Sequence, residues 1–263
     1  MSVSKFRPLQ LATGAAIALC MAAISPANAW ISDCSQLPSH WALKEALIAA
    51  QSQSNGGFGL EMWGTIVDRD GQVCAVAFTG SDRGAQWPGS RVISAQKAYT
   101  ANAFSLPGLA LSTANLYTAT QPGGSLYGLQ HSNPVDPALA YLGPATEFGT
   151  SKDPMVGYRV GGVNVFGGGL ALYNSKGVLL GAIGVSGDSS CADHNIAWRT
   201  RHTLGLDYVP AGVSGDATRP DNIVYDITPQ PGQMPGVSPS GWGHPICSTA
   251  ATTIATTVLP IIP

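Results

Sequence analysis

A tight-turn signal between two apolar runs constrains the fold more than any other feature of this sequence. The run LEMWGTIVD (60–68) leads into RDG (69–71), and QVCAVAFTG (72–80) follows at once. Asp-Gly between two strand-like runs is a strong indicator of a β-hairpin. A hairpin makes its two strands antiparallel neighbours, so the sequence predicts an antiparallel sheet.

Glycines divide a second apolar region, GGVNVFGGGLALYNSKGVLLGAIGVSGD, into short pieces. The pieces predict strands at 162–166, 168–174 and 178–185, with NSKG (174–177) as another turn. Together with the hairpin, these segments give an expected sheet of about five strands.

Helical spacing of apolar residues is present in three other segments. They span 38–53, where Ser39 is placed to cap the first turn, 91–104 and 191–204. The order helix, hairpin, helix, three strands, helix predicts an α+β fold: a single domain in which helices pack on the antiparallel sheet.

Two long segments, 109–160 and 205–263, lack a clear period. The first is predicted to be an inserted loop, because its stretch 121–137 is rich in turn-forming residues and also carries aromatic and apolar ones. A loop this long is typically functional or disordered, and its apolar content argues for order. The second is predicted to be a C-terminal extension of the same domain, and it contains GWGHPIC (241–247).

The N-terminus has the pattern of a secretory signal peptide. A positively charged start is followed by an apolar stretch over 11–24 and by the small-residue pattern ANA at 27–29. We therefore predict a signal peptide over 1–29, cleaved near Ala29, and a periplasmic or secreted mature protein over 30–263.

The cysteine count fits that compartment. Four cysteines remain after cleavage: Cys34, Cys74, Cys191 and Cys247. An even number favours two disulfides, with three possible pairings that the sequence does not choose between. A thiolate metal site is the alternative, but no pair has C-x-x-C spacing, and Cys191-x-x-His194 is only one half-site. Cys20 raises the alternative of a lipoprotein, which the bulky Leu19 before it disfavours.

The composition of the sequence bears on whether the protein binds nucleic acid or spans a membrane. The formal net charge is −2, charged residues make up 11% of the chain, and no basic run is present in the predicted mature part. Nucleic acid is therefore an unfavoured partner. No later apolar stretch is long enough to span a bilayer.

The loop GVSGDSSCADHN (184–195) invites several catalytic motifs that it does not satisfy. The G-x-S-x-G elbow of hydrolases fails because Asp188 occupies its last glycine, and the lysine of a phosphate-binding loop is missing. We predict instead that Ser189, Ser190 or Asp193 caps the helix that follows.

Two histidines are candidate iron ligands. His194 lies in the first turn of the predicted helix, where the dipole disfavours an imidazolium and leaves the neutral ring that heme iron needs. His131 lies in the apolar stretch LYGLQHSNP, which could form a wall for a porphyrin. The alternative is that each histidine only holds backbone groups by hydrogen bonds. His40 is a weaker third candidate, and the absence of C-x-x-C-H excludes covalent heme attachment.

The pieces TIVDRDGQVCAVAF, SRVISAQKAYTANAF and GVLLGAIGVSGDSSCADHNIA together resemble the HbpS/GlcG-like heme-binding family. The match is closest at Lys97–Ala101 and Gly181–Gly187, and it extends over about 38–204 with an interruption at 109–160. The resemblance implies a profilin-like, five-stranded antiparallel sheet with packed helices, and self-association into homo-oligomers. It also implies heme or tetrapyrrole binding in some members, and heme degradation or redox sensing in others.

The resulting expectation is an extracytoplasmic heme-binding protein, either a scavenger or the sensing partner of a membrane receptor. His131 or His194 would bind the iron, Lys97 and Arg199 would meet the propionates, and the insertion would shield the ring.

Two other functions stay open. One is an enzyme acting on a small organic acid or on heme, with Asp188 and His194 as its acid/base pair. The other is a ligand-free oligomeric interaction module whose surface is the functional part.

Overall fold

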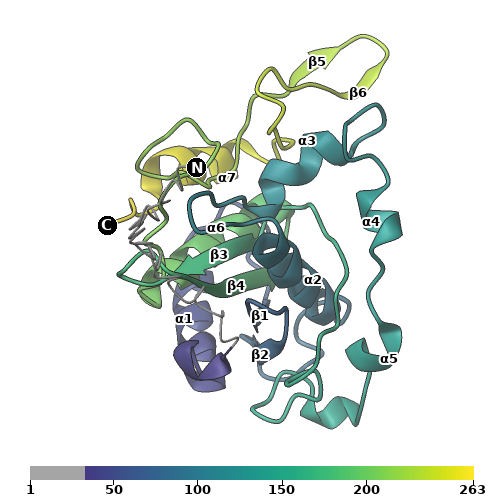
Figure 1. Ribbon diagram of the computed structural model, residues 1–263, viewed down its shortest axis with the longest axis vertical. Helices are drawn as coiled ribbons and strands as arrows, with labels where there is room; N and C mark the ends of the chain where they lie inside the picture. The colour runs from purple at the N-terminus through teal and green to yellow at the C-terminus, as the bar shows by residue number, and fades with distance from the viewer. Residues whose placement is uncertain (1–32) are drawn as a thin grey trace, which may run out of the picture. The chain divides into compact units, whose positions relative to one another are not determined.

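A computed structural model describes residues 33–263, and its centre is a four-stranded antiparallel sheet with the strand order β2-β1-β4-β3 (Figure 1). The strands are β1 (Trp63–Asp68), β2 (Val73–Phe78), β3 (Gly169–Tyr173) and β4 (Leu179–Ser186). The predicted hairpin is confirmed: β1 and β2 pair antiparallel, with Trp63 opposite Phe78. Gly71 in its turn has a φ of +76°, which glycine adopts without strain.

The prediction of five strands is wrong by one, because residues 162–166 do not form a strand. Val163 and Val165 are buried in a satellite cluster of apolar side chains beside the sheet. The backbone N–H of Asn164 donates to the Thr100 hydroxyl at 3.0 Å, and no neighbouring strand pairs with it. Side-chain packing therefore takes this segment away from the sheet. Two strands in the C-terminal extension, β5 (Thr228–Gln230) and β6 (Gln233–Val237), form a separate hairpin that the sequence did not predict.

The three predicted helices are confirmed as α1 (His40–Gln51), α2 (Ser90–Ala103) and α6 (Ser190–Thr203). The Ser39 hydroxyl accepts the Ala42 N–H at 3.3 Å and caps α1 as expected. Helix α2 packs on one face of the sheet, against β1 and β4, whereas α1 and α6 pack on the other. The α+β class with an antiparallel sheet and packed helices is thus confirmed.

Short helices punctuate the rest of the chain (Figure 1). They are η1 (Cys34–Gln36), η2 (Thr113–Leu116), α3 (Tyr117–Thr120), α4 (Leu129–Ser132), α5 (Pro137–Ala140), η3 (Ala145–Glu147), α7 (Thr249–Thr253) and a π-helical turn (Ile254–Val258). Within the described residues, no helix is both long and apolar enough to cross a bilayer. The predicted signal peptide lies outside the residues that the structure describes.

Buried ion pairs fasten the insertion and the C-terminal extension to the core. Arg91 of α2 bonds Asp153 of the insertion, with Nε 2.8 Å from Oδ2, and its Nη1 donates to the Ala140 carbonyl at 2.7 Å. Arg201 of α6 bonds both carboxylate oxygens of Asp221 in the extension through Nη1 and Nη2, and both side chains are wholly buried. Separating such a pair is costly, because each charge would be left buried without its partner. The two pairs therefore hold the insertion and the extension in place on the core.

Gly184 of β4 shows why the strand GAIGVSG is rich in glycine. A Cβ at this position would lie 2.0 Å from the Ser94 carbonyl oxygen and 2.4 Å from the Ala98 nitrogen, both in α2. Only glycine lets the helix approach the sheet this closely. Gly184 therefore serves close packing of the helix on the sheet.

The two predicted disulfides are present. Cys34 pairs with Cys74, and Cys191 pairs with Cys247, with Cα atoms 5.4 and 5.9 Å apart. The first joins the segment before α1 to β2. The second joins the first turn of α6 to the C-terminal extension.

Candidate functional site

A buried ion pair lies where β4 ends and α6 begins. The Lys97 ammonium of α2 is 2.7 Å from Oδ2 of Asp193, and it also donates to the Val185 carbonyl at 3.1 Å. The other carboxylate oxygen, Oδ1, accepts the N–H groups of Gly187 and Asp188 at 3.1 and 2.8 Å. Asp193 therefore fixes the turn after β4. Ser189 occupies the N-cap position of α6, but its hydroxyl makes no capping bond.

Burial sets the protonation of Asp193. Removal from water raises the pKa of its carboxyl to about 6, although the Lys97 charge and the hydrogen bonds it accepts oppose that shift. A carboxyl with such a pKa can take up a proton just below neutral pH.

A small cleft of about 320 Å³ opens beside this pair. Apolar side chains of Trp87, Ile93 and Phe166 line this cleft. Lys97 and Asp193 are among its polar lining residues. Lys97 thus lines a cavity, although its ammonium already has two partners.

Asp188 and His194, the acid/base pair considered from sequence, have separate partners. The Asp188 carboxylate accepts the N–H groups of Phe58 and Leu60 at 2.8 and 3.2 Å, and so anchors the loop after α1. No hydrogen bond joins Asp188 to His194, and the structure does not bring the two side chains together as a pair.

His194 is fully buried and serves as a link to the C-terminal extension. Its Nε2 lies 3.1 Å from Oδ1 of Asn222, an oxygen that also accepts the Ile223 N–H. Nε2 is therefore the donor of the ring, and the buried Nδ1 has no hydrogen-bond partner within the described part of the chain. Burial lowers the pKa of His194 to about 3, so the ring is neutral. Its neutrality comes mainly from burial and not from the helix dipole.

The other two predicted ligand-binding residues lie elsewhere. His131 is exposed on α4 in the insertion. Arg199 donates from Nη1 to Oε1 of Gln53 at 2.9 Å, which joins α6 to the end of α1. Of Lys97, His194, Arg199 and His131, it is Lys97 that lines the small cleft beside β4 and α6.

A larger cleft of about 540 Å³ lies between the start of α2, the loop before it and the insertion. Trp63, Tyr141 and Phe148 supply aromatic walls, and Phe148 also stacks on the Arg91 guanidinium at 3.7 Å. Arg83 is exposed at the rim. Sequence reasoning missed this cleft, because Trp63, Arg83 and Tyr141 are brought together only by the folding of the insertion.

His244 is a second buried histidine that the sequence did not single out. Burial lowers its pKa to about 4, and its ring packs against Tyr117 with centroids 5.2 Å apart. The only sequence signal for it is the H-x-x-C spacing within GWGHPIC.

Comparison with known proteins supplies the family. No curated protein matches the chain. Among solved structures, a PduOC–heme complex is 23% identical with a TM-score of 0.45, and the match covers 64% of this chain and 94% of that chain. The Klebsiella pneumoniae protein ORFY is 22% identical with a TM-score of 0.42, covering 64% and 90%. HbpS is 17% identical with a TM-score of 0.39, covering 63% and 86%.

The family model for the haem degrading protein HbpS and its relatives matches residues 39–201, from the start of α1 to the last turns of α6. The match includes the hairpin, α2 and the strand GAIGVSG that carried the resemblance. Because it spans more than half of the sequence, the chain belongs to the HbpS-like family.

Proposed function

We propose that this protein binds heme, or a related tetrapyrrole, in the 540 Å³ cleft between α2 and the insertion. The observation that carries the proposal is the aromatic-walled cleft in a member of a family whose name refers to haem. Its volume lies in the usual range of about 300–1,000 Å³ for ligand sites.

The lining of the cleft fits the two ends of a heme molecule. A porphyrin ring needs apolar and aromatic walls, which Trp63, Tyr141 and Phe148 provide. The propionates need cations, and Arg83 is exposed at the rim, where it can pair with one of them. Arg91 is committed to Asp153 and forms part of the floor.

Among the described residues that line the cleft, Tyr141 has the side chain able to ligate ferric iron, because none of them is a histidine, cysteine or methionine. His131, the ligand expected from sequence, belongs to the same insertion and is exposed. His194 lies buried against the C-terminal extension and would need that extension to move. We therefore place Tyr141 first and His131 second as iron ligands.

The finer parts of the role are also proposals. An extracytoplasmic location is supported by the two disulfides, which persist in oxidising compartments. Self-association and a membrane-receptor partner are supported by the family resemblance alone. Scavenging and sensing are both compatible with a heme site whose rim is open to solvent.

Hemin titration of the disulfide-bonded mature protein, followed by absorbance, tests the site. We expect a saturable, red-shifted Soret band for the wild type. Tyr141→Phe removes the phenolate and should shift the band and weaken binding, whereas Tyr127→Phe, an exposed tyrosine of the insertion, is the matched control. Arg83→Ala should weaken binding by a few fold through loss of an exposed charge pair.

The histidine variants decide between ligands. If the Soret band is lost in His131→Ala but kept in Tyr141→Phe, the iron ligand is His131 and not Tyr141. A folded wild-type protein with no saturable band would overturn heme binding altogether. The family name also favours a second candidate function, heme degradation. Catalytic loss of the Soret band with ascorbate or peroxide, faster than for free hemin, would support it.

A further inference from the structure

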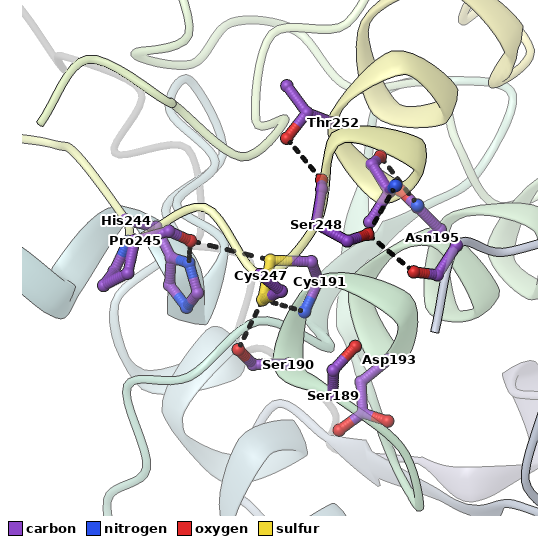
Figure 2. Close-up of a disulfide and its surroundings, with 12 residues drawn as sticks. Ser189, Ser190, Cys191, Asp193, Asn195, His244, Pro245, Cys247, Ser248 and Thr252 are labelled. Atoms are coloured by element: carbon purple, nitrogen blue, oxygen red, sulfur yellow. Dashed lines mark hydrogen bonds between the residues drawn. A yellow bond between two sulfur atoms is a disulfide. The ribbon is translucent and has the colours of Figure 1, made fainter. Parts of the chain in front are cut away.

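The disulfide between Cys191 and Cys247 lies beside the buried His244 (Figure 2). Cys191 comes from the first turn of α6, and His244 and Cys247 come from the C-terminal extension, with H-x-x-C spacing. Both sulfur atoms and one ring nitrogen of His244 lie within 4.8 Å of one another. Two thiolates and an imidazole at such distances are a ligand set that zinc prefers.

The two ring nitrogens of His244 differ in their hydrogen-bond partners. Its Nδ1 donates to the Pro245 carbonyl at 2.8 Å, which leaves the lone pair on Nε2, and this buried Nε2 has no hydrogen-bond partner among residues 33–263. Buried polar atoms nearly always have partners, so the orphaned nitrogen requires an explanation. A metal-binding histidine commonly has its other nitrogen held by a carbonyl in this way.

The disulfide is open to reduction. The Cys247 side chain is exposed, so an external thiolate can reach its sulfur. That sulfur also accepts the Cys191 N–H at 3.2 Å and lies 3.4 Å from the Ser190 hydroxyl. Both contacts place this sulfur at the N-terminus of α6.

We propose that reduction of Cys191–Cys247 creates a zinc site formed by both thiolates and His244. Two external thiols give two protein thiols and one external disulfide. Zn²⁺ then displaces the two thiol protons, and water takes the fourth position. With Zn–S bonds of about 2.3 Å, two thiolates on a tetrahedral ion lie about 3.8 Å apart. The exposed Cys247 side chain can provide this separation by rotation.

The second disulfide provides a matched comparison. Cys34 and Cys74 lie near the Asp68 carboxylate in a group of the same size. Asp68, however, already accepts the N–H groups of Asp70 and Gln72 through Oδ1, at 3.0 and 2.9 Å. No histidine belongs to this group, so we expect no comparable zinc site there.

The test uses Co²⁺ as a spectroscopic substitute for Zn²⁺ in protein reduced with a phosphine. Cys34→Ser/Cys74→Ser leaves only the pair in question. We expect this variant, when reduced, to bind one equivalent of Co²⁺ with a near-ultraviolet thiolate-to-metal charge-transfer band that Zn²⁺ abolishes. The oxidised variant should show no such band. His244→Gln should weaken Co²⁺ binding by more than about tenfold. Replacing a residue that only hydrogen-bonds to a metal ligand already costs about tenfold in affinity, and His244 would be a ligand itself.

The matched variant is Cys191→Ser/Cys247→Ser, in which reduction should produce no such band. Circular dichroism with each titration reports whether the reduced protein stays folded. A folded, reduced protein without the band overturns the proposal. The same holds for a band that survives replacement of Cys191 and Cys247, or for unfolding on reduction that Co²⁺ does not reverse. No hemin is present in these experiments, so their outcome is independent of the proposed heme site.

Discussion

Asp193→Ala is expected to lower the free energy of unfolding by about 3–5 kcal/mol, the usual cost of breaking a buried ion pair from one side. The substitution leaves the Lys97 ammonium buried, with the Val185 carbonyl as its remaining described partner. It also removes the acceptor for the N–H groups of Gly187 and Asp188. Urea denaturation at pH 7 measures the loss, and the exposed Lys176→Met is a control expected to change stability by no more than about 0.5 kcal/mol.

Lys97→Met should cost less than Asp193→Ala, because the remaining partner can become neutral. The pKa of Asp193 is already raised to about 6 with the lysine present. Without that cation the carboxyl will titrate higher still and take up a proton near pH 7, so no bare charge stays buried. The stability of Lys97→Met should therefore fall as the pH rises above neutral. An equal or larger cost for Lys97→Met at pH 7 would contradict this account.

Local signals predicted most of the fold. The hairpin, the cap at Ser39 and the three long helices depend on residues close in sequence, and all were found as expected. The segment 162–166 has strand-like residues, yet its buried valines pack beside η2 and its backbone bonds the Thr100 side chain. Which edge a short strand joins depends on the tertiary structure, and no local pattern reports it.

The sequence pointed to Lys97 and His194 but not to the partners of their side chains, and it did not point to the cleft lined by Tyr141. Lys97 was expected to face a ligand, and in the structure it pairs with Asp193, 96 residues further along the chain. His194 was expected to be neutral, and it is, but the cause is burial against Asn222 from the extension. The pairing of four cysteines likewise depends on the fold. Contacts between distant segments carry no signal in a single sequence.

Acid is expected to destabilise the protein as the pH falls from about 6.5 toward 4, because two histidines are buried in the neutral form. The pKa values of His194 and His244 are lowered to about 3 and about 4, against an ordinary value of 6.5. Between these values the unfolded chain binds protons that the folded chain does not. Stability therefore rises with pH in this window, by up to about 1.4 kcal/mol per pH unit for each histidine.

Asp193 works in the opposite direction over part of the same window. Its folded pKa of about 6 lies above the ordinary 3.8, so between these values the folded chain binds the extra proton. The contribution of Asp193 to the stability of the protein therefore decreases as the pH rises. Between pH 4 and 6 this decrease cancels about as much of the pH dependence as one of the two histidines contributes. The net slope should therefore correspond to about one proton, or about 1.4 kcal/mol per pH unit, between pH 5 and 6, and it should be smaller near pH 6.5, where the unfolded histidines are only half protonated.

Three variants separate these contributions when urea unfolding is measured from pH 4 to 8. His194→Gln and His244→Gln should each lower the change of unfolding free energy with pH by an amount that corresponds to up to about one bound proton. Acid should therefore destabilise each variant less than the wild type. Asp193→Asn should change the slope with the opposite sign, because it removes the opposing group and keeps one acceptor oxygen. A wild-type stability that is flat between pH 6.5 and 4, or histidine variants with an unaltered slope, would show that these rings gain protons while folded. The buried contacts of His194 with Asn222, and of His244 with Pro245, would then have to open in acid without unfolding the domain.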